Sequence, residues 1–218
     1  MLTFNKRIPR FHSLIYALGL WALISISSAQ TRNSTGRALI NPLPPIPAEY
    51  VEASRTAVTL DKRPAELIRY ERRDRRNAGQ GGEHFSMIIN PQGQLQGFMR
   101  KTLTQTRGTL PTQAEARDLA IAFVTQYAPD LLSNYVFDAT TMETEPLTIM
   151  GANGNNTRAA IQYVRVKMRH RDTKLWFFVF IDVNRQVMLF ERDLAWDYMR
   201  FRRATEKWLF DDWRTRND

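Results

Sequence analysis

The chain has 218 residues, of which 43% are apolar, and a formal net charge of +9 at pH 7. This apolar content is enough to bury a core, which excludes an intrinsically disordered chain. Cysteine is absent, which excludes disulfides, thiolate metal sites and cysteine nucleophiles.

The N-terminal stretch has the pattern of a secretory signal. Basic residues precede an uncharged apolar run that ends near Ile26, and Ser27-Ser28-Ala29 supplies small residues for a signal peptidase. We therefore predict a signal peptide over residues 1–29, cleaved after Ala29, and a periplasmic or secreted protein with no transmembrane segment after its removal. The alternative is a retained anchor, but the apolar run has about 14 residues against the ~20 that a membrane-spanning helix needs.

Residues 30–48 are polar and then rich in proline, with four prolines between Pro42 and Pro47. Because proline fixes φ and removes a backbone donor, we predict an extended linker of polyproline type. A ligand for a proline-binding module is the alternative.

Residues 49–83 are predicted to form a helical and basic N-terminal segment, with Pro64 at a helical first turn. The most basic patch of the chain runs from Arg69 to Arg76 and contains Tyr70. Such a patch can contact nucleic acid or anionic lipid. It can also be a solvated helix end in which Glu71 pairs with Arg75. Because an exported protein rarely meets nucleic acid, we predict no nucleic-acid partner.

Residues 84–193 are predicted to form the main domain, which begins with a β-hairpin. Phe85, Met87 and Ile89 alternate with less apolar residues, and Asn90-Pro91-Gln92-Gly93 follows as a turn. A partner strand then runs from Gln94 to about Leu103.

A helix is predicted after Pro111. Thr112 and Glu115 have the spacing of a capping box, and Ala128-Pro129 ends the helix. Apolar residues recur on one stripe, which needs a sheet to lie on. They are Ala116, Leu119, Ala120, Phe123, Val124 and Tyr127.

Further strands are predicted between Tyr135 and Met150 and between Ile161 and Asp193. In the first strand of the second stretch, apolar residues alternate with Arg165, Lys167 and Arg169, and Arg171 follows, so that one face is strongly positive. In the next strand, from Leu175 to Ile181, both faces are apolar, which predicts a central position.

The two predicted hairpins resemble each other. Setting Ile89-Asn90 against Ile181-Asp182 aligns Phe85 with Phe177 and Phe98 with Phe190, with a similar turn in each copy. We predict that they are distant repeats.

The chain resembles the PepSY family and its secreted YcdB-type and YpeB-type relatives over roughly residues 85–193. The resemblance rests on a helix that opens Pro-Thr-x-x-Glu-Ala at Pro111, on the strand at Tyr163-Val164-Arg165-Val166 and on the stretch from Trp176 to Asn184. It implies an α+β fold, an antiparallel sheet packed on one main helix in a cystatin-like layout. It also implies a module that binds proteins or restrains peptidases and carries no catalytic set. Where the family has glycine in the second turn this chain has Arg185, so we expect Asn184 to take any left-handed position.

Residues 194–218 form an aromatic and basic tail with a predicted helix from Ala204 to Arg214. Its aromatic side chains can cover the second apolar face of the sheet, or they can stay exposed as a docking surface. The candidate docking residues are Trp196, Trp208 and Trp213.

No catalytic residue, cofactor or metal site is predicted. His84 and His170 lie outside any hydrolase or metal motif and are expected at the surface. The acidic pairs Glu143/Glu145 and Asp211/Asp212 are expected to be solvated. The sequence leaves two functions open, an exported module that binds a protein or peptide of the cell envelope, and a binder of an anionic ligand, polysaccharide or membrane surface through the basic sheet face.

Overall fold

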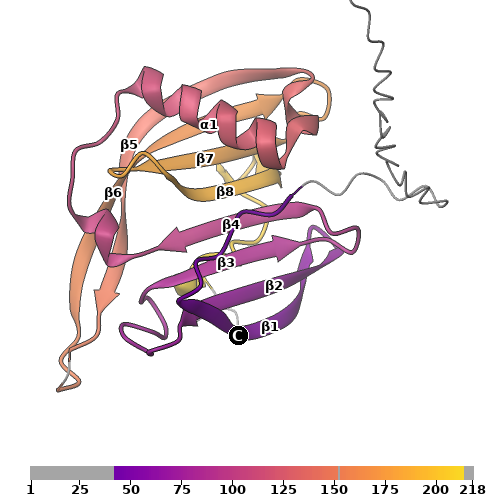
Figure 1. The fold of residues 1–218 in the computed structure, drawn as a ribbon. Coiled ribbons are helices and arrows are strands. Elements are labelled where there is room, and N and C mark those ends of the chain that lie inside the picture. Colours follow the sequence, from indigo (N-terminus) through magenta and orange to yellow (C-terminus); the bar gives the residue numbers. More distant parts are fainter. Residues whose placement is uncertain (1–41, 152, 214–218) are drawn as a thin grey trace, which may run out of the picture. The chain divides into compact units, whose positions relative to one another are not determined.

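One antiparallel sheet of eight strands dominates the structure, a computed structural model that describes residues 42–151 and 153–213 (Figure 1). The predicted signal peptide and residues 30–41 of the predicted linker lie outside the described residues. The strand order is β1-β2-β3-β4-β8-β7-β6-β5. The strands are β1 (Tyr50–Leu60), β2 (Arg63–Arg72), β3 (His84–Ile89), β4 (Leu95–Lys101), β5 (Tyr135–Ile149), β6 (Thr157–His170), β7 (Trp176–Asp182) and β8 (Val187–Leu194).

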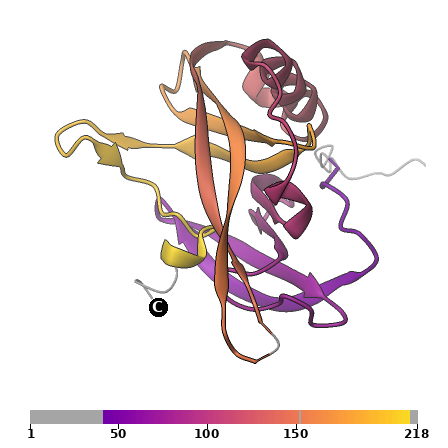
Figure 2. The same cartoon turned by 90° about the vertical axis from the view of Figure 1, so that its left-hand side faces the viewer.

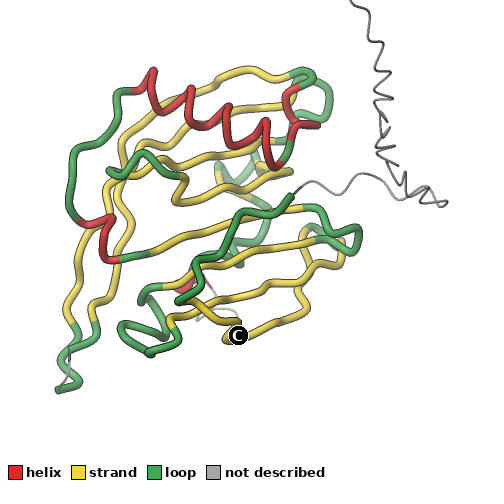
Figure 3. The backbone as a smooth tube through the Cα atoms, in the orientation of Figure 1, coloured by secondary structure: helices red, strands yellow, loops and turns green. Residues whose placement is uncertain are grey.

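The predicted α+β layout, a sheet packed on one main helix, is wrong because the sheet outweighs the helix (Figure 3). Helix α1 (Gln113–Tyr127) makes its main contacts with β5, β6, β7 and β8. The short 3-10 helices η1 (Leu103–Thr106) and η2 (Pro129–Leu132) lie on either side of it in the chain. Half of the sheet therefore extends beyond α1.

The segment 49–83, predicted to be helical, forms β1 and β2 instead. Its Glu- and Arg-rich composition suits a helix, but β2 buries residues on both faces, Leu67 on one and Ile68 on the other, and pairs with β3. Packing against neighbouring strands thus overrides the local preference. The predicted boundary near residue 83 also does not exist, because β2 and β3 belong to the same sheet.

The predicted repeat is visible in the register of the two hairpins. Met87 pairs with Phe98 in β3–β4, and Val179 pairs with Phe190 in β7–β8. Each hairpin also has a register shift one residue before its turn, between Ile88 and Ile89 and between Phe180 and Ile181. The same four-stranded meander thus occurs twice, as β1 to β4 and as β5 to β8, and the two copies join through β4 and β8.

The two hairpin turns share their hydrogen bonds, and they correct one expectation. Asn90 Oδ1 accepts from the backbone N–H groups of Gln92 and Gln94, and Asp182 Oδ1 accepts from those of Asn184 and Gln186. The left-handed residue is the fourth in each four-residue turn, Gly93 (φ 77°) in the first and Arg185 (φ 58°) in the second. Arg185, and not Asn184, therefore takes the left-handed position.

The helix and its apolar stripe are confirmed. The Thr112 hydroxyl accepts from the Glu115 N–H at 3.2 Å, and Ala116, Ala120 and Val124 are fully buried on the sheet. The strand predicted to be central, β7, lies between β6 and β8 and is buried along its whole length. Phe177 and Val179 face α1, while Trp176, Phe178 and Phe180 face the other side of the sheet.

The C-terminal segment covers part of this second face. Leu209 is 1% exposed in the same apolar cluster as Phe178 and Phe180, and Trp208 packs against that cluster. Figure 2 shows α1 and the C-terminal turn on opposite sides of β5 and β6. The predicted helix from Ala204 is wrong, because among the described residues helical structure begins only at Asp211. Residues 204–210 follow the sheet surface instead.

Candidate functional site

A pocket of about 510 Å³ lies between the sheet face opposite α1 and the C-terminal segment, and we call it the tail pocket. Strands β5 to β8 supply its floor, and the segment after β8 supplies its other wall. The floor residues are Glu143, Glu145, Tyr163, Arg165, Phe178, Phe180 and Glu191, and the wall residues are Trp196, Phe201, Arg202, Arg203, Lys207, Phe210, Asp212 and Trp213.

Stacked side chains build the floor of the tail pocket. The rings of Tyr163 and Phe180 are parallel within 6°, with their centroids 4.5 Å apart. The Arg165 guanidinium lies 5.9 Å from the centroid of the Phe178 ring. Burial and the neighbouring Glu143 charge raise the pKa of Tyr163, so its hydroxyl stays neutral and can donate to Glu143 Oε2 at 3.4 Å. The floor is therefore a flat aromatic surface with a few fixed polar groups.

The charged groups of the floor are paired. Arg165 contacts Glu143 at 2.9 Å, and Arg203 binds Glu191 through both guanidinium nitrogens at 2.6 and 2.7 Å. Glu145 contacts the buried Lys101 at 3.2 Å, and burial raises the pKa of Glu145. Bidentate Arg–carboxylate contacts fix orientation as well as charge. The floor is thus close to electrically neutral and suits an apolar or aromatic group.

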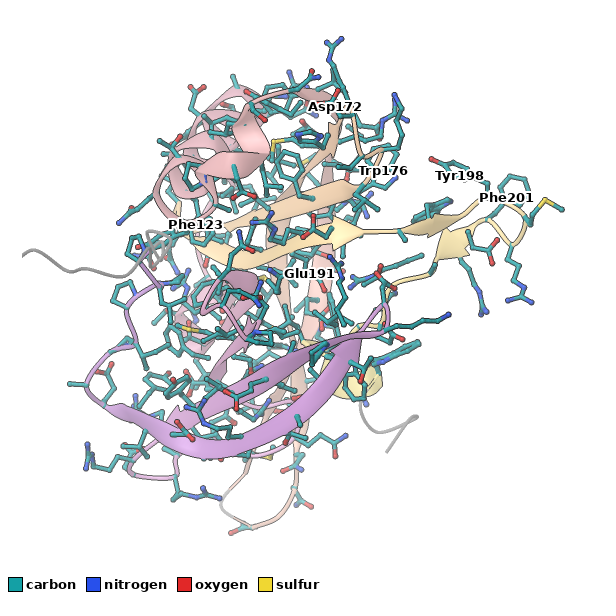
Figure 4. All side chains as sticks on the ribbon, turned by 90° about the vertical axis from the view of Figure 1, so that its right-hand side faces the viewer. Phe123, Asp172, Trp176, Glu191, Tyr198 and Phe201 are labelled. Carbon is teal, nitrogen blue, oxygen red and sulfur yellow. The ribbon has the colours of Figure 1, made fainter. Side chains whose placement is uncertain are left out.

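A two-stranded arm borders the pocket. Strands β9 (Trp196–Asp197) and β10 (Arg202–Arg203) pair with each other, and the residues between them form the tip. Tyr198, Met199 and Phe201 at this tip are 61%, 91% and 85% exposed. Figure 4 shows Tyr198 and Phe201 projecting from the end of the arm, away from the sheet.

The arm is held in a defined shape. Asp197 Oδ1 accepts from the N–H groups of Met199 and Arg200, both at 3.1 Å, which closes the turn. At its base, Arg203 donates to the carbonyls of Thr205 and Glu206 while it binds Glu191. Such contacts reduce the entropy that a surface loses on binding a partner.

A buried ion cluster fixes the end of the tail to the other half of the sheet. Asp211 accepts from Arg69 at 2.9 Å and from the Gly81 N–H at 2.5 Å, and Arg69 also contacts Glu71 at 3.0 Å. Burial alone would raise the pKa of Asp211, but the charge of Arg69 and the hydrogen bond from the Gly81 N–H act against burial and lower that pKa. The tail is therefore attached through charge and hydrogen bonds as well as through Leu209.

Several expectations about charged residues are wrong, because the sheet buries these residues or pairs them with opposite charges. Arg69 and Glu71 of the basic patch are buried on β2 and not solvated on a helix end, although Arg75 does contact Glu71 at 3.2 Å. His84, expected at the surface, is fully buried. Three of the acidic residues expected to be solvated form ion pairs instead, namely Glu143, Glu145 and Asp211. Asp212 is exposed, as expected.

The sequence-predicted site residues divide into three groups. Arg165, Trp196 and Trp213 line the tail pocket, and the Lys167 ammonium lies 5.5 Å from the Trp196 ring. Lys167 and Arg169 both stack on Trp176, 3.8 and 5.2 Å from its centroid. The last two residues lie outside the tail pocket. Arg171 is exposed in the turn after β6. Trp208 lies over β1, and its indole N–H is 3.4 Å from the Thr59 carbonyl oxygen.

On the face predicted to be strongly positive, two of the four basic residues are paired with carboxylates. Lys167 contacts Asp138 at 3.0 Å, and Arg165 contacts Glu143, both acidic residues of β5. The pairing partners were missed because they lie about 20 to 30 residues earlier in the chain, on a strand whose register the sequence does not show. Tyr163, Phe178 and Phe180 were placed in the sheet but not in a site.

Comparison with known proteins found no relative of this chain. No family model matches the chain, and neither a curated protein nor a solved structure matches it. Within residues 42–151 and 153–213, no group of His, Asp and Glu side chains has the arrangement of a metal site. In the same residues, no helix has the length and apolarity needed to cross a membrane.

Proposed function

We propose that the chain is a non-enzymatic binding module of the cell envelope that takes a protein or peptide partner at the arm and the tail pocket. The observation that carries the proposal is the tip of the arm, where Tyr198, Met199 and Phe201 are exposed on a structured turn. Large apolar side chains gathered on a surface mark interaction sites more often than chance. The aromatic floor beside them offers a pocket for a side chain of the partner.

The charges around the arm indicate the chemistry of the partner. Arg200, Arg202 and Lys207 are exposed on or beside the arm. A partner surface with an apolar centre and acidic residues around it would complement this arrangement. The floor itself is neutral, so the anionic-ligand alternative has less support than it had from the sequence.

The resemblance to PepSY-type modules is part of the proposal. It rests on the residues around Thr112, Tyr163 and Trp176 and is the reason to place the partner among envelope proteins, peptidases included. Export of the chain follows from the predicted signal peptide over residues 1–29.

Affinity capture with the chain beginning at Gln30 tests the proposal. Wild-type protein and a Met199→Ser/Phe201→Ser variant are compared against envelope extract, with Met142→Ser as the matched control, since Met142 is 70% exposed on β5. We expect one set of proteins to be retained by wild type and by Met142→Ser and to be lost with the arm variant. Equal retention by all three proteins would contradict the arm as the docking site. A turnover activity of the purified protein would contradict the non-enzymatic assignment.

The salt dependence of binding distinguishes contacts made by the basic residues from apolar contacts made by the tip of the arm. Contacts made by Arg200, Arg202 and Lys207 weaken between ~0.05 and 0.5 M salt, since the Debye length falls below about 5 Å over this range. Apolar contacts of Met199 and Phe201 persist. We expect partial loss of the captured partner at high salt and nearly complete loss with the arm variant.

A further inference from the structure

The two edges of the eight-stranded sheet differ in their chemistry. Edge strand β1 exposes charged side chains, among them Glu52 and Arg55, which pair with each other at 2.9 Å. Charges on an edge strand protect it against pairing with another chain. Edge strand β5 instead carries the uncharged Thr140, Met142 and Thr144 at alternate positions. Figure 2 shows the β5–β6 hairpin in front of the other strands. Of the two edges, β5 is therefore the one that a further strand can join at lower cost.

The backbone groups of Thr140, Met142 and Thr144 point away from the sheet. The Thr148 N–H donates to the Gly81 carbonyl at 2.9 Å, so it points away from β6. Backbone groups alternate in direction along a strand, and the β5–β6 register is unbroken from 139 to 149. Thr140, Met142 and Thr144 thus have the same outward direction as Thr148. Among the described residues, none bonds to the outward backbone groups of these three.

This open stretch of backbone has two defined ends. Pro146 has no N–H to offer, and the Thr148 N–H is already bonded. At the other end, the register shifts between Phe137 and Ala139, which leaves Asp138 in a bulge. The regular free edge therefore spans residues 140–144.

The centre of the open stretch is an exposed apolar side chain. Met142 is 70% exposed and pairs across the strands with Val164, which lies in the core under α1. Its side chain thus lies on the sheet face that α1 covers elsewhere. A strand joined to this edge would bring side chains beside Met142 and remove part of its surface from water.

We propose that a second copy of the chain pairs with this stretch, β5 against β5 in antiparallel order, across a two-fold axis at Met142. The outward residues read Thr-x-Met-x-Thr from either end. Self-pairing therefore sets Met142 opposite Met142 of the second copy, and Thr140 opposite Thr144. Each facing pair exchanges both of its N–H···O bonds, since outward groups meet outward groups. The contact is the same on both copies, so it closes as a dimer.

The ends of the stretch match in this register. Pro146 of one copy lies opposite the bulge at Asp138 of the other, so the ladder ends where neither strand continues its regular bonds. A different partner would have to bring an uncharged extended segment with the same limits. A second copy always brings one.

The charges next to the stretch also permit self-pairing. In the proposed register Glu143 faces Thr141 and Glu145 faces Ala139, so that no two like charges stand directly opposite each other. Both glutamates already have a cation in their own copy. Specific standard-size interfaces engage about 20–30 residues on each side. Pairing over residues 140–144 is smaller, so we expect a dimer with a dissociation constant in the micromolar range.

Charged side chains at position 142 test the two-fold axis. Sedimentation is measured for the chain beginning at Gln30 as wild type, Met142→Lys and Met142→Glu. Because position 142 faces itself, each variant sets two like charges opposite each other, which destabilises a strand pair. We expect the wild type to dimerise as its concentration rises, each variant alone to stay monomeric, and an equimolar mixture of the two variants to dimerise again. The control Met199→Lys, at the exposed tip of the arm, should dimerise like wild type.

Three outcomes would overturn the proposal. The first is a wild-type protein that stays monomeric at millimolar concentration. The second is a dimer that Met199→Lys dissociates and Met142→Lys does not, which would place the contact at the arm. The third is a mixture of Met142→Lys and Met142→Glu that stays monomeric, which would show that position 142 does not face itself. Met142 lies on the sheet face opposite the tail pocket, so dimerisation and partner capture at the arm can fail independently.

Amide hydrogen exchange separates strand pairing from any other dimer. The amides of Thr140, Met142 and Thr144 are free in one copy and bonded in the dimer. Those of Thr141 and Glu143 point at β6 in both states. We expect exchange at the first three to slow by at least about tenfold as the wild type dimerises, and exchange at the other two to change less. Unchanged exchange at all five in a dimeric sample would overturn the pairing of β5 with β5.

Discussion

Phe98 on β4 and Phe190 on β8 face each other across the seam between the two halves of the sheet. They are also counterparts in the repeat, so an approximate two-fold axis passes between them. The ring of Phe123 on α1 lies over both, with centroid distances of 6.1 Å to Phe98 and 5.4 Å to Phe190. Helix α1 thus covers the seam as well as its own half of the sheet.

The left-handed turn residues give the first prediction. A non-glycine residue in the left-handed region costs about 1–2 kcal/mol, so Gly93→Arg should lower the free energy of unfolding by this amount. Arg185 already occupies that conformation and donates to Glu115 at 2.7 Å and to the Thr109 carbonyl at 3.3 Å. Arg185→Gly should therefore change stability by less than about 1 kcal/mol, because relief of strain offsets the lost exposed contacts.

Urea unfolding of the two variants measures this difference. If Arg185→Gly stabilised the protein as much as Gly93→Arg destabilised it, the contacts of Arg185 would contribute nothing.

The sequence predicted those elements whose signals are local. The Thr112 cap, the apolar stripe of α1 and the Asn90-Pro91-Gln92-Gly93 turn depend on residues within one or two turns of each other, and the structure has all three. The segment 49–83 was mispredicted because its strands exist through pairing with β3. The width of the sheet depends on the same pairing, and no local pattern reports it.

The second prediction concerns the attachment of the tail. Asp211→Asn removes the charge that faces Arg69 and weakens the bond to the Gly81 N–H. Because breaking a buried ion pair leaves an uncompensated charge, we expect a loss of about 2–4 kcal/mol in the free energy of unfolding. Asp212→Asn is the matched control, since Asp212 is exposed, and should change stability by less than about 0.5 kcal/mol.

Urea unfolding followed by tryptophan fluorescence measures both variants, because Trp208 and Trp213 flank Asp211. Equal stabilities of the two variants would show that the buried ion cluster does not hold the tail.

The third prediction concerns the contact between Leu209 and Gly97. A Cβ atom on Gly97 would lie 2.9 Å from Leu209 Cδ1, which is too close. Gly97→Ala should therefore destabilise the protein by about 1–2 kcal/mol, and Leu209→Ala, at a fully buried position, by about 2–4 kcal/mol. In the double variant, the methyl group added at position 97 occupies space that the Leu209 side chain has vacated. The double variant should therefore lose less stability than the sum of the losses of the two single variants, by at least about 1 kcal/mol. Strictly additive losses would contradict this packing of the tail on β4.

The tail pocket was only partly predictable. The aromatic and basic composition of the tail identified Trp196 and Trp213, and the alternation in β6 identified Arg165. The acidic partners on β5 and the stack of Tyr163 on Phe180 depend on cross-strand register, which one sequence does not specify. The composition of the tail does not show that β9 and β10 pair as a hairpin. Without that pairing, the exposed tip at Tyr198, Met199 and Phe201 could not be predicted.

The last prediction concerns the pH dependence of stability, which His84 should dominate above pH 5. Burial, with the nearby Arg69 charge, lowers the pKa of His84 from 6.5 to about 3. Its Nδ1 lies 3.0 Å from the Gly82 carbonyl, which fits a neutral ring that donates from Nδ1. Between pH 6.5 and 3 the unfolded chain therefore binds a proton that the folded chain does not, so stability falls as the pH falls.

At about 1.4 kcal/mol per pH unit, the wild-type protein should lose about 2 kcal/mol through His84 between pH 7 and pH 5. His84→Asn can keep a donor to the Gly82 carbonyl but has no group that titrates in this range. The variant should lose correspondingly less stability over the same interval in urea unfolding. His170→Asn, at a partly exposed residue in the other half of the sheet, is the control and should retain the wild-type pH dependence. A wild-type slope that survives in His84→Asn would assign the acid sensitivity to another group.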